Sequence, residues 1–257
     1  MLRNILLAFD FAKKDFKQRY VGTGLGQFWY ILSPMLMIFI YTVIFSDFMK
    51  MKLDIIDNSY GYSIYLVPGI LAWTTFNTVI SRLSSSFFDK ANLLKKIPVP
   101  MYVFQISIII TESLILLLSF SLAIVFLLLI HHPVTLAFLW LLPVLFLQML
   151  FVFSLGVILS LFVPFFKDLK VAIPIIIQLS FWATPIIDMK EIVIDKYPLI
   201  ILFNPFYYFI SIYQDIFLYS KSPTIVDLLI IVTISCVTFT IAAYLYTKII
   251  ATIKDII

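Results

Sequence analysis

Long apolar runs separated by short polar connections dominate this chain. Runs of roughly 20 apolar residues match the hydrocarbon core of a bilayer, so each is typical of a membrane-spanning helix. The pattern predicts six such spans, at about 27–48, 62–86, 101–130, 134–164, 170–187 and 224–248. We therefore expect an all-α membrane protein in which residues 1–257 form a single transmembrane domain, with spans one to five between 27 and 187.

The first 22 residues have a different pattern. Their apolar positions share one arc of a helical wheel while charged residues fill the rest, as in a helix that lies in the headgroup plane. Arg19 is at the edge of the arc, where a long side chain can reach water. The arc consists of Leu2, Ile5, Leu6, Phe9, Ala12, Phe16 and Tyr20. We expect an N-terminal interface helix over residues 1–22.

Three alternating glycines, Gly22, Gly24 and Gly26, follow this helix. They permit a sharp bend, because glycine adopts backbone angles that other residues avoid. Gly22 and Gly26 also have the spacing of a helix-dimerisation pair. Their position beside Arg19, at the headgroup boundary, favours an elbow. The segment lacks the short apolar core and cleavage site of a secretory signal, so we expect it to remain in the mature protein.

Composition and charge placement extend this picture. The chain is 63% hydrophobic and only 12% charged, and its mean hydropathy is +1.09. With the N-terminus inside, five of the 18 lysines and arginines are outside, which satisfies the positive-inside rule. Those five are Lys50, Lys52, Lys190, Lys196 and Lys221. We therefore expect a multi-pass protein of the cytoplasmic membrane with both termini in the cytoplasm.

The cytoplasmic connection 88–98 is predicted to contain a short helix. Asp89 is a suitable N-cap and Pro98 ends the helix about two turns later. Its apolar face consists of Leu93, Leu94 and Ile97, and Lys90, Lys95 and Lys96 supply charge. Such a helix suits a groove on a soluble partner. The alternative, a basic loop held at the membrane surface, accounts for the lysines but not for both leucines.

The outer segment 188–222 is too apolar for a simple loop, yet its apolar pieces are too short to span. We expect re-entrant or interfacial helices there, buried in protein or lining a cavity. Asn204 and Pro205 are typical of the N-cap and first position of a helix, which we expect to end near Asp215.

Polar residues within the spans leave two interpretations open. Thr74, Thr75 and Thr78 in the second span face either a water-filled path or neighbouring helices, with about equal weight. Glu112 is a functional candidate because a carboxylate inside a membrane is costly. It stands alone, whereas a proton relay needs several such groups, which favours the alternative: a protonated or hydrogen-bonded glutamate inside the bundle, near Gln105, Gln148 or Gln178.

The chemistry of most enzymes is missing. None of the six glycines begins a G-x-x-x-x-G-K-[S/T] phosphate loop, so the chain is not expected to bind ATP in that way. His131 and His132 are adjacent with no other likely ligand near them, and Cys236 is the single cysteine. We expect no catalytic residue, no metal site and no cofactor in this chain. Two equal halves are not evident, which argues against a self-contained transporter.

Several of these segments, in the same order, carry a family resemblance. The chain resembles the membrane subunit of type-2 ABC exporters, particularly those for bacterial polysaccharides such as O-antigen. The matching segments are 17–29 (KQRYVGTGLGQFW) with Pro34, 67–76 (VPGILAWTTF), 92–98 (NLLKKIP), 183–187 (ATPII) and Asn204-Pro205. The chain departs from the family pattern at 70–72 and at Asp188, which leaves the exact substrate open.

The resemblance implies a homodimer that exports a lipid-linked polysaccharide across the inner membrane, powered by two separate ATPase subunits that bind Mg-ATP. It implies a coupling helix at Asp89–Ile97 that docks on the ATPase, through Asp89, Asn92, Leu93, Leu94, Lys95, Lys96 and Ile97. It assigns the interface helix and elbow to Phe16, Arg19, Tyr20, Gly22, Gly24 and Gly26, and a pair of re-entrant helices to Ile187–Asp215. No nucleic acid is expected as a partner.

As a hypothesis, two copies enclose a path between their first and fifth spans. A stripe at helical spacing would line it from the first span, although plain packing explains such a stripe about twice as well. The expected channel-lining residues are Tyr30, Pro34, Met37, Tyr41, Phe45, Gln178, Trp182 and Tyr207. Two alternatives remain: an ABC permease for a small drug or lipid, and a proton-coupled transporter that uses Glu112.

Overall fold

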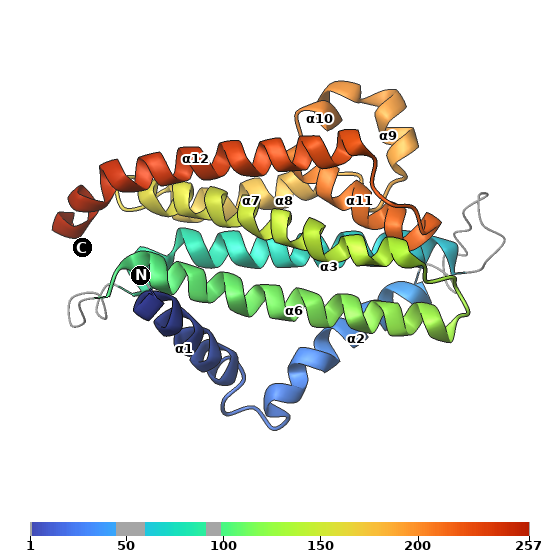
Figure 1. Cartoon of the computed structure of the whole chain (residues 1–257), viewed down its shortest axis with the longest axis horizontal. Helices are drawn as coiled ribbons and strands as arrows, with labels where there is room; N and C mark the ends of the chain where they lie inside the picture. Colours follow the sequence, from blue (N-terminus) through green and yellow to red (C-terminus); the bar gives the residue numbers. More distant parts are fainter. Residues whose placement is uncertain (1, 45–59, 91–98, 257) are drawn as a thin grey trace.

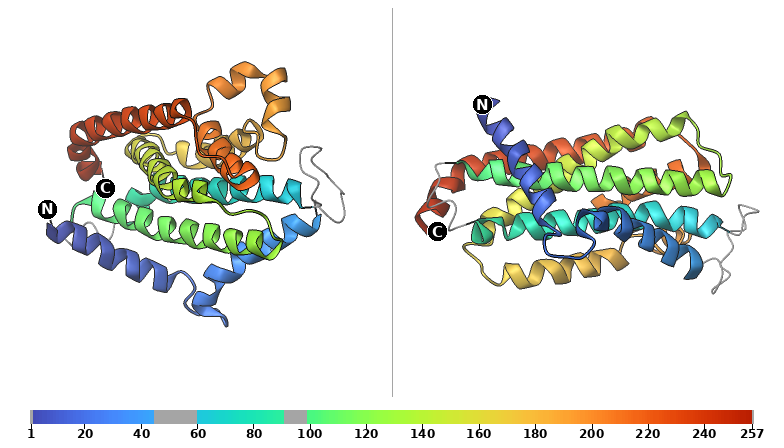
Figure 2. Two further views of the ribbon diagram at one scale, coloured as in Figure 1. Left: turned by 45° about the vertical axis from the view of Figure 1, so that its right-hand side comes forward. Right: turned by 90° about the horizontal axis from the view of Figure 1, so that it is seen from below.

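The computed structural model describes residues 2–44, 60–90 and 99–256, and within these ranges the chain is helical without a β-strand (Figure 1). Four elements form the body: α3 (Gly61–Ser84), α6 (Met101–Leu129), η3 with α7 (Leu136–Trp140, Leu141–Phe162) and α12 (Ile225–Ile256). These elements lie side by side in both views of Figure 2. The chain termini lie at the same end of this bundle (Figure 1).

Four helices of the described chain are long and apolar enough to cross a membrane. They are Gly61–Ser84, Met101–Leu129, Leu136–Phe162 and Ile225–Ile253, and they correspond to the second, third, fourth and sixth predicted spans. Of these, α3 is the most buried and α12 the least. The protein is therefore a multi-pass membrane protein with α3 at the centre of its bundle.

The first and fifth predicted spans are represented by shorter helices. Both α2 (Trp29–Thr42) and α8 (Leu169–Trp182) have 14 residues, which corresponds to about 21 Å of helix against a hydrocarbon core of roughly 30 Å. The predicted first span continues into residues 45–48, which lie outside the described ranges. The count of six spans stays a prediction.

The N-terminal part forms a V (Figure 1). One arm is α1 (Leu2–Gln18), the other is α2, and a turn followed by η1 (Gly26–Phe28) joins them. Gly22 has φ +87° and Gly26 has φ +50°, so two of the three elbow glycines adopt the left-handed backbone. A side chain at Gly22 would be strained for this reason, although nothing lies within 4 Å of the position a Cβ would take.

The apolar arc predicted on α1 divides between two environments. Ile5, Leu6 and Phe9 are exposed on the single chain, as expected for a face in contact with lipid. Ala12 is buried together with Ala8 where α1 packs on α6. The prediction that Ala12 faces lipid is therefore wrong, because small residues here allow the two helices to approach closely.

The outer segment contains three helices rather than a pair: α9 (Lys190–Lys196), α10 (Pro198–Leu202) and α11 (Pro205–Tyr219). Asn204 caps α11 by accepting a hydrogen bond from the N–H of Phe206 at 3.0 Å, as predicted from the Asn-Pro pair. The helix continues to Tyr219, four residues beyond the expected end, and stops where Ser220 adopts φ +50°. Phe217 in this extra turn packs against Phe120 of α6 and Phe138 of η3, and this packing supports the turn.

The chain between α8 and α9 is not helical, so its carbonyl groups need other partners. Tyr62 donates to the carbonyl of Ile187 at 2.6 Å, and Tyr65 donates to that of Asp188 at 3.0 Å. Gln214 donates to Pro185 at 3.2 Å, and Asn204 donates to Ala183 at 3.1 Å. Side chains of α3, of α11 and of its N-cap therefore hold this break, which explains why α8 ends before residue 187.

Candidate functional site

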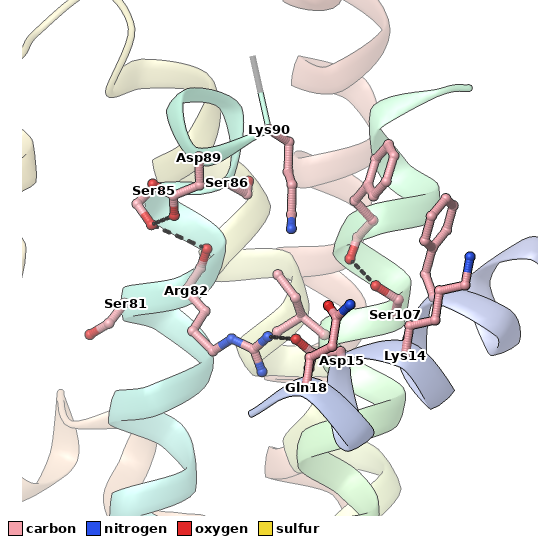
Figure 3. Close-up of a pocket in the computed structure, with 13 residues that line it drawn as sticks. Lys14, Asp15, Gln18, Ser81, Arg82, Ser85, Ser86, Asp89, Lys90 and Ser107 are labelled. Carbon is pink, nitrogen blue, oxygen red and sulfur yellow. Dashed lines mark hydrogen bonds and ion pairs between the residues drawn. The ribbon is translucent and has the colours of Figure 1, made fainter. Parts of the chain in front are cut away.

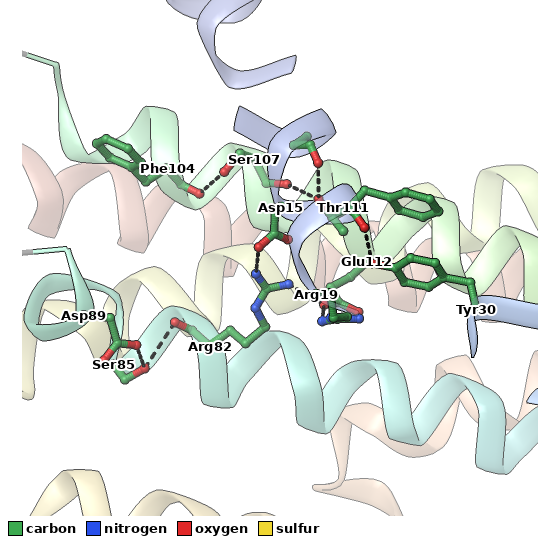
Figure 4. Close-up of polar contacts among 12 residues, drawn as sticks. Asp15, Arg19, Tyr30, Arg82, Ser85, Asp89, Phe104, Ser107, Thr111 and Glu112 are labelled. Atoms are coloured by element: carbon green, nitrogen blue, oxygen red, sulfur yellow. Dashed lines mark hydrogen bonds and ion pairs between the residues drawn. The ribbon is translucent and has the colours of Figure 1, made fainter. Parts of the chain in front are cut away.

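Four charged side chains form a cluster where α1 meets α3 and α6. Glu112 of α6 accepts hydrogen bonds from Arg19 and, at 2.6 Å, from Arg82 of α3. The second nitrogen of Arg82 donates to Asp15 of α1 at 2.7 Å. Figure 4 shows Arg82 reaching across to Asp15, with Arg19 beside Glu112. The cluster holds two positive and two negative groups, so its formal charge is zero.

Local sequence explains how α1 contributes two members of this cluster. Asp15 lies within the last turn of α1 and Arg19 follows four residues later. Residues four apart on a helix lie on the same face, so both side chains reach the same neighbours. Arg19 was expected to extend toward water from the edge of the amphipathic arc, and the structure instead directs it to Glu112.

Burial makes this cluster consequential. The side chain of Glu112 is only 3% exposed and those of Arg19 and Arg82 are each 25% exposed. Removing one partner of a buried ion pair typically costs roughly 3–5 kcal/mol, because the remaining charge is left without compensation. The expectation that Glu112 is hydrogen-bonded within the bundle is confirmed, but its partners are two arginines rather than a glutamine.

The cluster is also unsuited to carrying protons. A relay needs groups that exchange protons, and an arginine keeps its charge at every physiological pH. Glu112 contacts two such groups, so its carboxylate has the surroundings of a structural anchor. The arrangement ties three helices together, and among the described residues both ion-pair partners of Glu112 are arginines.

Aromatic rings brace the elbow next to this cluster. Tyr30 stacks on Phe16 with ring centroids 3.9 Å apart, and Tyr20 meets it edge-on at 4.7 Å. The hydroxyl of Tyr30 donates to the carbonyl of Phe16 at 2.8 Å. These contacts hold α1 and the start of α2 together across the turn.

A polar cavity of about 440 Å³ lies beside the cluster, between α1, the ends of α3 and α4 (Ser86–Asp89), and the first turns of α6. We call it the α1–α4 notch. Lys90 extends into it from above (Figure 3), and within the described residues its ammonium group has no hydrogen-bond or ion-pair partner. Lys14 lines the opposite wall, 5.9 Å above the ring of Phe11. The notch therefore presents unpaired positive charge.

The residues expected to couple to an ATPase are only partly described. Asp89 is the last residue of α4 and accepts a hydrogen bond from Ser85 at 2.6 Å. The helix that Asp89 is expected to begin continues into residues 91–98, which lie outside the described ranges, so its role as an N-cap stays a prediction. Asn92, Leu93, Leu94, Lys95, Lys96 and Ile97 lie outside the described ranges.

The residues expected to line a channel divide into two groups. Tyr30 and Pro34 are buried against the chain itself, on the same face of α2 as Ile38 and Thr42. Tyr41 and Tyr207 are half-buried, and Phe45 lies outside the described ranges. The exposed members are Met37, Gln178 and Trp182. The stripe that helical spacing predicted on the first span therefore combines residues from the buried face of α2 with residues from its exposed face.

The three threonines of the second span form hydrogen bonds within their own helix, and these bonds decide neither for a water-filled path nor for bonding to a neighbouring helix. The hydroxyl groups of Thr74 and Thr75 donate to the carbonyl of Leu71, and that of Thr78 donates to Thr74. Among residues 2–44, 60–90 and 99–256, no group of three His, Cys, Asp or Glu side chains could hold a metal ion. The charge cluster and the notch beside it therefore form the candidate functional site.

Sequence reasoning missed Arg82 altogether. A glutamate below the membrane surface needs a cation as partner, and Arg82 is the basic residue in the last turn of the neighbouring predicted span. That requirement was a usable signal. What no sequence pattern supplied was the packing of α1 on α6, which brings Asp15 and Arg19 to the same place.

Comparison with known proteins identifies relatives over most of the chain. The family described as "ABC-2 type transporter" matches residues 10–218. A protein named O-antigen export system permease protein RfbA, from Klebsiella pneumoniae, is 29% identical over 208 residues, which are 80% of this chain and 78% of that protein. A second, also named RfbA, from Myxococcus xanthus, is 25% identical over 233 residues, or 90% of this chain and 87% of the relative.

Proposed function

The chain belongs to the ABC-2 type transporter family, and on that premise we propose that it is the permease half of an ATP-driven polysaccharide exporter. Two copies would form a channel in the inner membrane, and two separate ATP-binding subunits would supply the energy. The cargo would be a lipid-linked polysaccharide of the O-antigen type. The observation that carries this proposal is the similarity, over four-fifths of the chain, to permeases named for O-antigen export.

The position of the notch supports a proposed route for coupling to the ATPase. The α1–α4 notch lies at the end of the bundle where both termini lie (Figure 1), and the positive-inside rule supports the proposal that this end faces the cytoplasm. An acidic side chain of the ATPase would pair with Lys90 and Lys14 there. Lys90 itself belongs to the proposed coupling helix, Asp89–Ile97. The ATPase would thus contact the notch and the rest of the coupling helix together.

Movement of the ATPase would reach the channel through the charge cluster. A displacement of α4 acts on α3, whose Arg82 is bonded to Asp15 of α1 and to Glu112 of α6. The stacked rings of Phe16 and Tyr30 would then pass the motion from α1 to α2. Because α2 is proposed to border the path, tilting α1 would change the width of that path.

The exposed face of α8 supports the proposed position of the channel. Ile175, Leu179 and Trp182 are exposed at helical spacing on the single chain, and so is the polar Gln178 beside them. Facing α8 helices from two copies would place aromatic and amide groups along a polymer. Flat rings contact the apolar faces of sugars without fixing a register, which suits a chain that must slide.

Export should be tested in cells that lack their own O-antigen exporter. The gene would be expressed with its neighbouring ATPase gene and with glycosyltransferases that supply the lipid-linked polymer, and surface polysaccharide would be measured by immunoblot. We expect surface polymer that disappears when the ATPase is inactivated. Polymer that reaches the surface without ATP hydrolysis, or fails only when the proton gradient is collapsed, would contradict the proposal.

The docking role has its own test with a matched control. Replacing Leu93–Lys96 by alanines, or Lys90 by Glu, should abolish both export and stimulation of the ATPase. Lys17, an exposed lysine on α1 outside the notch, serves as the control when changed to Glu. Normal ATPase stimulation in the Lys90→Glu protein would argue against docking at the notch. Stimulation by small amphiphiles rather than by lipid-linked glycan would favour a drug or lipid permease.

A further inference from the structure

A second cavity, of about 250 Å³, lies at the break between α8 and α9, distant from the notch. It is lined by Trp182, Thr184, Pro185, Asp188, Val193, Lys196 and Tyr197. Trp182 is 70% exposed and Tyr197 is 58% exposed on the single chain, so both aromatic side chains are accessible from the cavity. We infer that this cavity, the α8–α9 pocket, binds a sugar ring of the exported polymer. The inference rests on the proposed function and goes beyond it by naming a site.

The walls of the pocket are held in place by the rest of the fold. Trp182 packs edge-on against Phe181 with ring centroids 5.4 Å apart, and Phe181 meets the buried Trp73 at 5.7 Å. The backbone carbonyl of Asp188 accepts a hydrogen bond from Tyr65. The hydroxyl of Thr184 is engaged by Asn204 at 2.7 Å. A site built on anchored elements recognises a ligand with less loss of conformational entropy than a mobile loop does.

The groups left over in the pocket have the chemistry of sugar recognition. Within the described residues, the carboxylate of Asp188 and the ammonium of Lys196 form no hydrogen bond or ion pair. A carboxylate accepts hydrogen bonds from hydroxyl groups, and an ammonium donates to hydroxyl and ring oxygens. Their charges cancel, so the pocket does not select a net charge. Two aromatic side chains remain for the apolar face of the ring.

The size and openness of the pocket also fit a transient occupant. Its volume of 250 Å³ is below the roughly 300–1000 Å³ of sites for drug-sized ligands, so it holds a short piece of a polymer rather than a long segment. With Trp182 at the exposed end of α8, such a piece would leave and be replaced as the chain advances. The pocket would act as a stacking point near the outer end of the path.

A zwitterionic lipid headgroup is the main competitor, because phosphate and ammonium groups would also match Lys196 and Asp188. A bound lipid headgroup would not need the exposed ring of Trp182 as a stacking surface, and it would leave Tyr197 without a role. Both aromatic side chains belong to the same cavity as the two charges. The combination therefore favours a hydroxyl-rich ring.

The test measures sugar binding directly. The permease–ATPase complex, in nanodiscs of phosphatidylcholine, would be titrated with the methyl glycosides of glucose, galactose, mannose and rhamnose. Saturation-transfer NMR would report contact with ring protons. We expect transfer from at least one glycoside, with Trp182→Ala weakening binding by roughly threefold to tenfold, as for the loss of one aromatic contact, and Trp182→Phe retaining most of it. Asp188→Asn should weaken binding as well.

Controls separate this inference from the proposed function. Phe146→Ala and Lys221→Gln alter exposed residues outside the pocket and should leave binding unchanged. No transfer from any of the four glycosides, equal transfer in wild type and Trp182→Ala, or competition by phosphatidylethanolamine in the nanodiscs would overturn the sugar site. Export of polysaccharide in cells would still be observed in these cases if the proposed function holds, so the two failures are distinguishable.

Discussion

Replacing Glu112 by glutamine is the sharpest perturbation of the charge cluster. The side chains have the same shape, and the amide oxygen can still accept a hydrogen bond, so the change mainly removes one negative charge. Arg82 then keeps its ion pair with Asp15, whereas Arg19 loses the ion-pair partner that it has among the described residues, and two guanidinium groups remain close together in a poorly solvated place. We expect α1 to loosen from α3 and α6, with loss of thermal stability and of ATPase coupling.

The size of the effect follows from burial. Leaving a buried charge unpaired costs roughly 3–5 kcal/mol. Glu112 is 3% exposed but both arginines are 25% exposed, so solvent screens part of the cost and we expect the lower end, about 3 kcal/mol. For a chain of this size, each kcal/mol lowers Tm by roughly 2–4 °C. Glu112→Gln should therefore lower Tm by about 6–12 °C.

The measurement is thermal unfolding of the detergent-purified protein, followed by size-exclusion chromatography after heating. Lys17→Gln, an exposed charge on α1 outside the cluster, is the control and should change Tm little. Adding Arg19→Gln to Glu112→Gln should recover part of the loss, because it removes an uncompensated charge. An unchanged Tm in Glu112→Gln, or strictly additive losses in the double variant, would refute the reasoning.

Three further predictions follow from other parts of the fold. A Cβ at Gly156 would lie 2.7 Å from Cβ of Leu83, so Gly156→Ala should destabilise by roughly 1–3 kcal/mol. Gly24→Ala, where nothing lies within 4 Å, should have little effect on Tm. Tyr65→Phe leaves the carbonyl of Asp188 without its donor and should destabilise the α8–α9 break by about 1–3 kcal/mol. Faster proteolysis there would support this, and an unchanged cleavage rate would contradict it. Burial lowers the pKa of His132 below 6.5, and this effect is larger than that of the hydrogen bond to the carbonyl of Phe217, which raises the pKa. Neutral His132 should therefore contribute its full stability above pH 6.5, and this contribution should be lost as the pH falls through the lowered pKa. Tm measured against pH should show this loss in the wild type but not in His132→Gln.

Much of the architecture was accessible from the sequence. Four of the predicted spans coincide with long helices, because a run of roughly 20 apolar residues has few alternatives to a helix in a bilayer. The elbow was predicted from glycines, and two of them have positive φ. The cap at Asn204 was predicted from its side chain and from the proline that follows. Each of these features depends on residues that are neighbours in the chain.

Tertiary structure alone decided the rest. The environment of a residue such as Ala12 or Tyr30 depends on which helix lies alongside it. Ala12 contacts α6 rather than lipid, and Tyr30 packs at the elbow rather than along a path. Periodicity in the sequence predicts which residues share a helix face, but not what that face contacts. The partners of Glu112 are 30 and 93 residues away in the chain. Composition and local spacing thus determined that this protein is a helical membrane bundle with an elbowed N-terminus. The charge cluster, the notch and the α8–α9 pocket exist only because packing joins distant segments, and no short-range pattern encodes that.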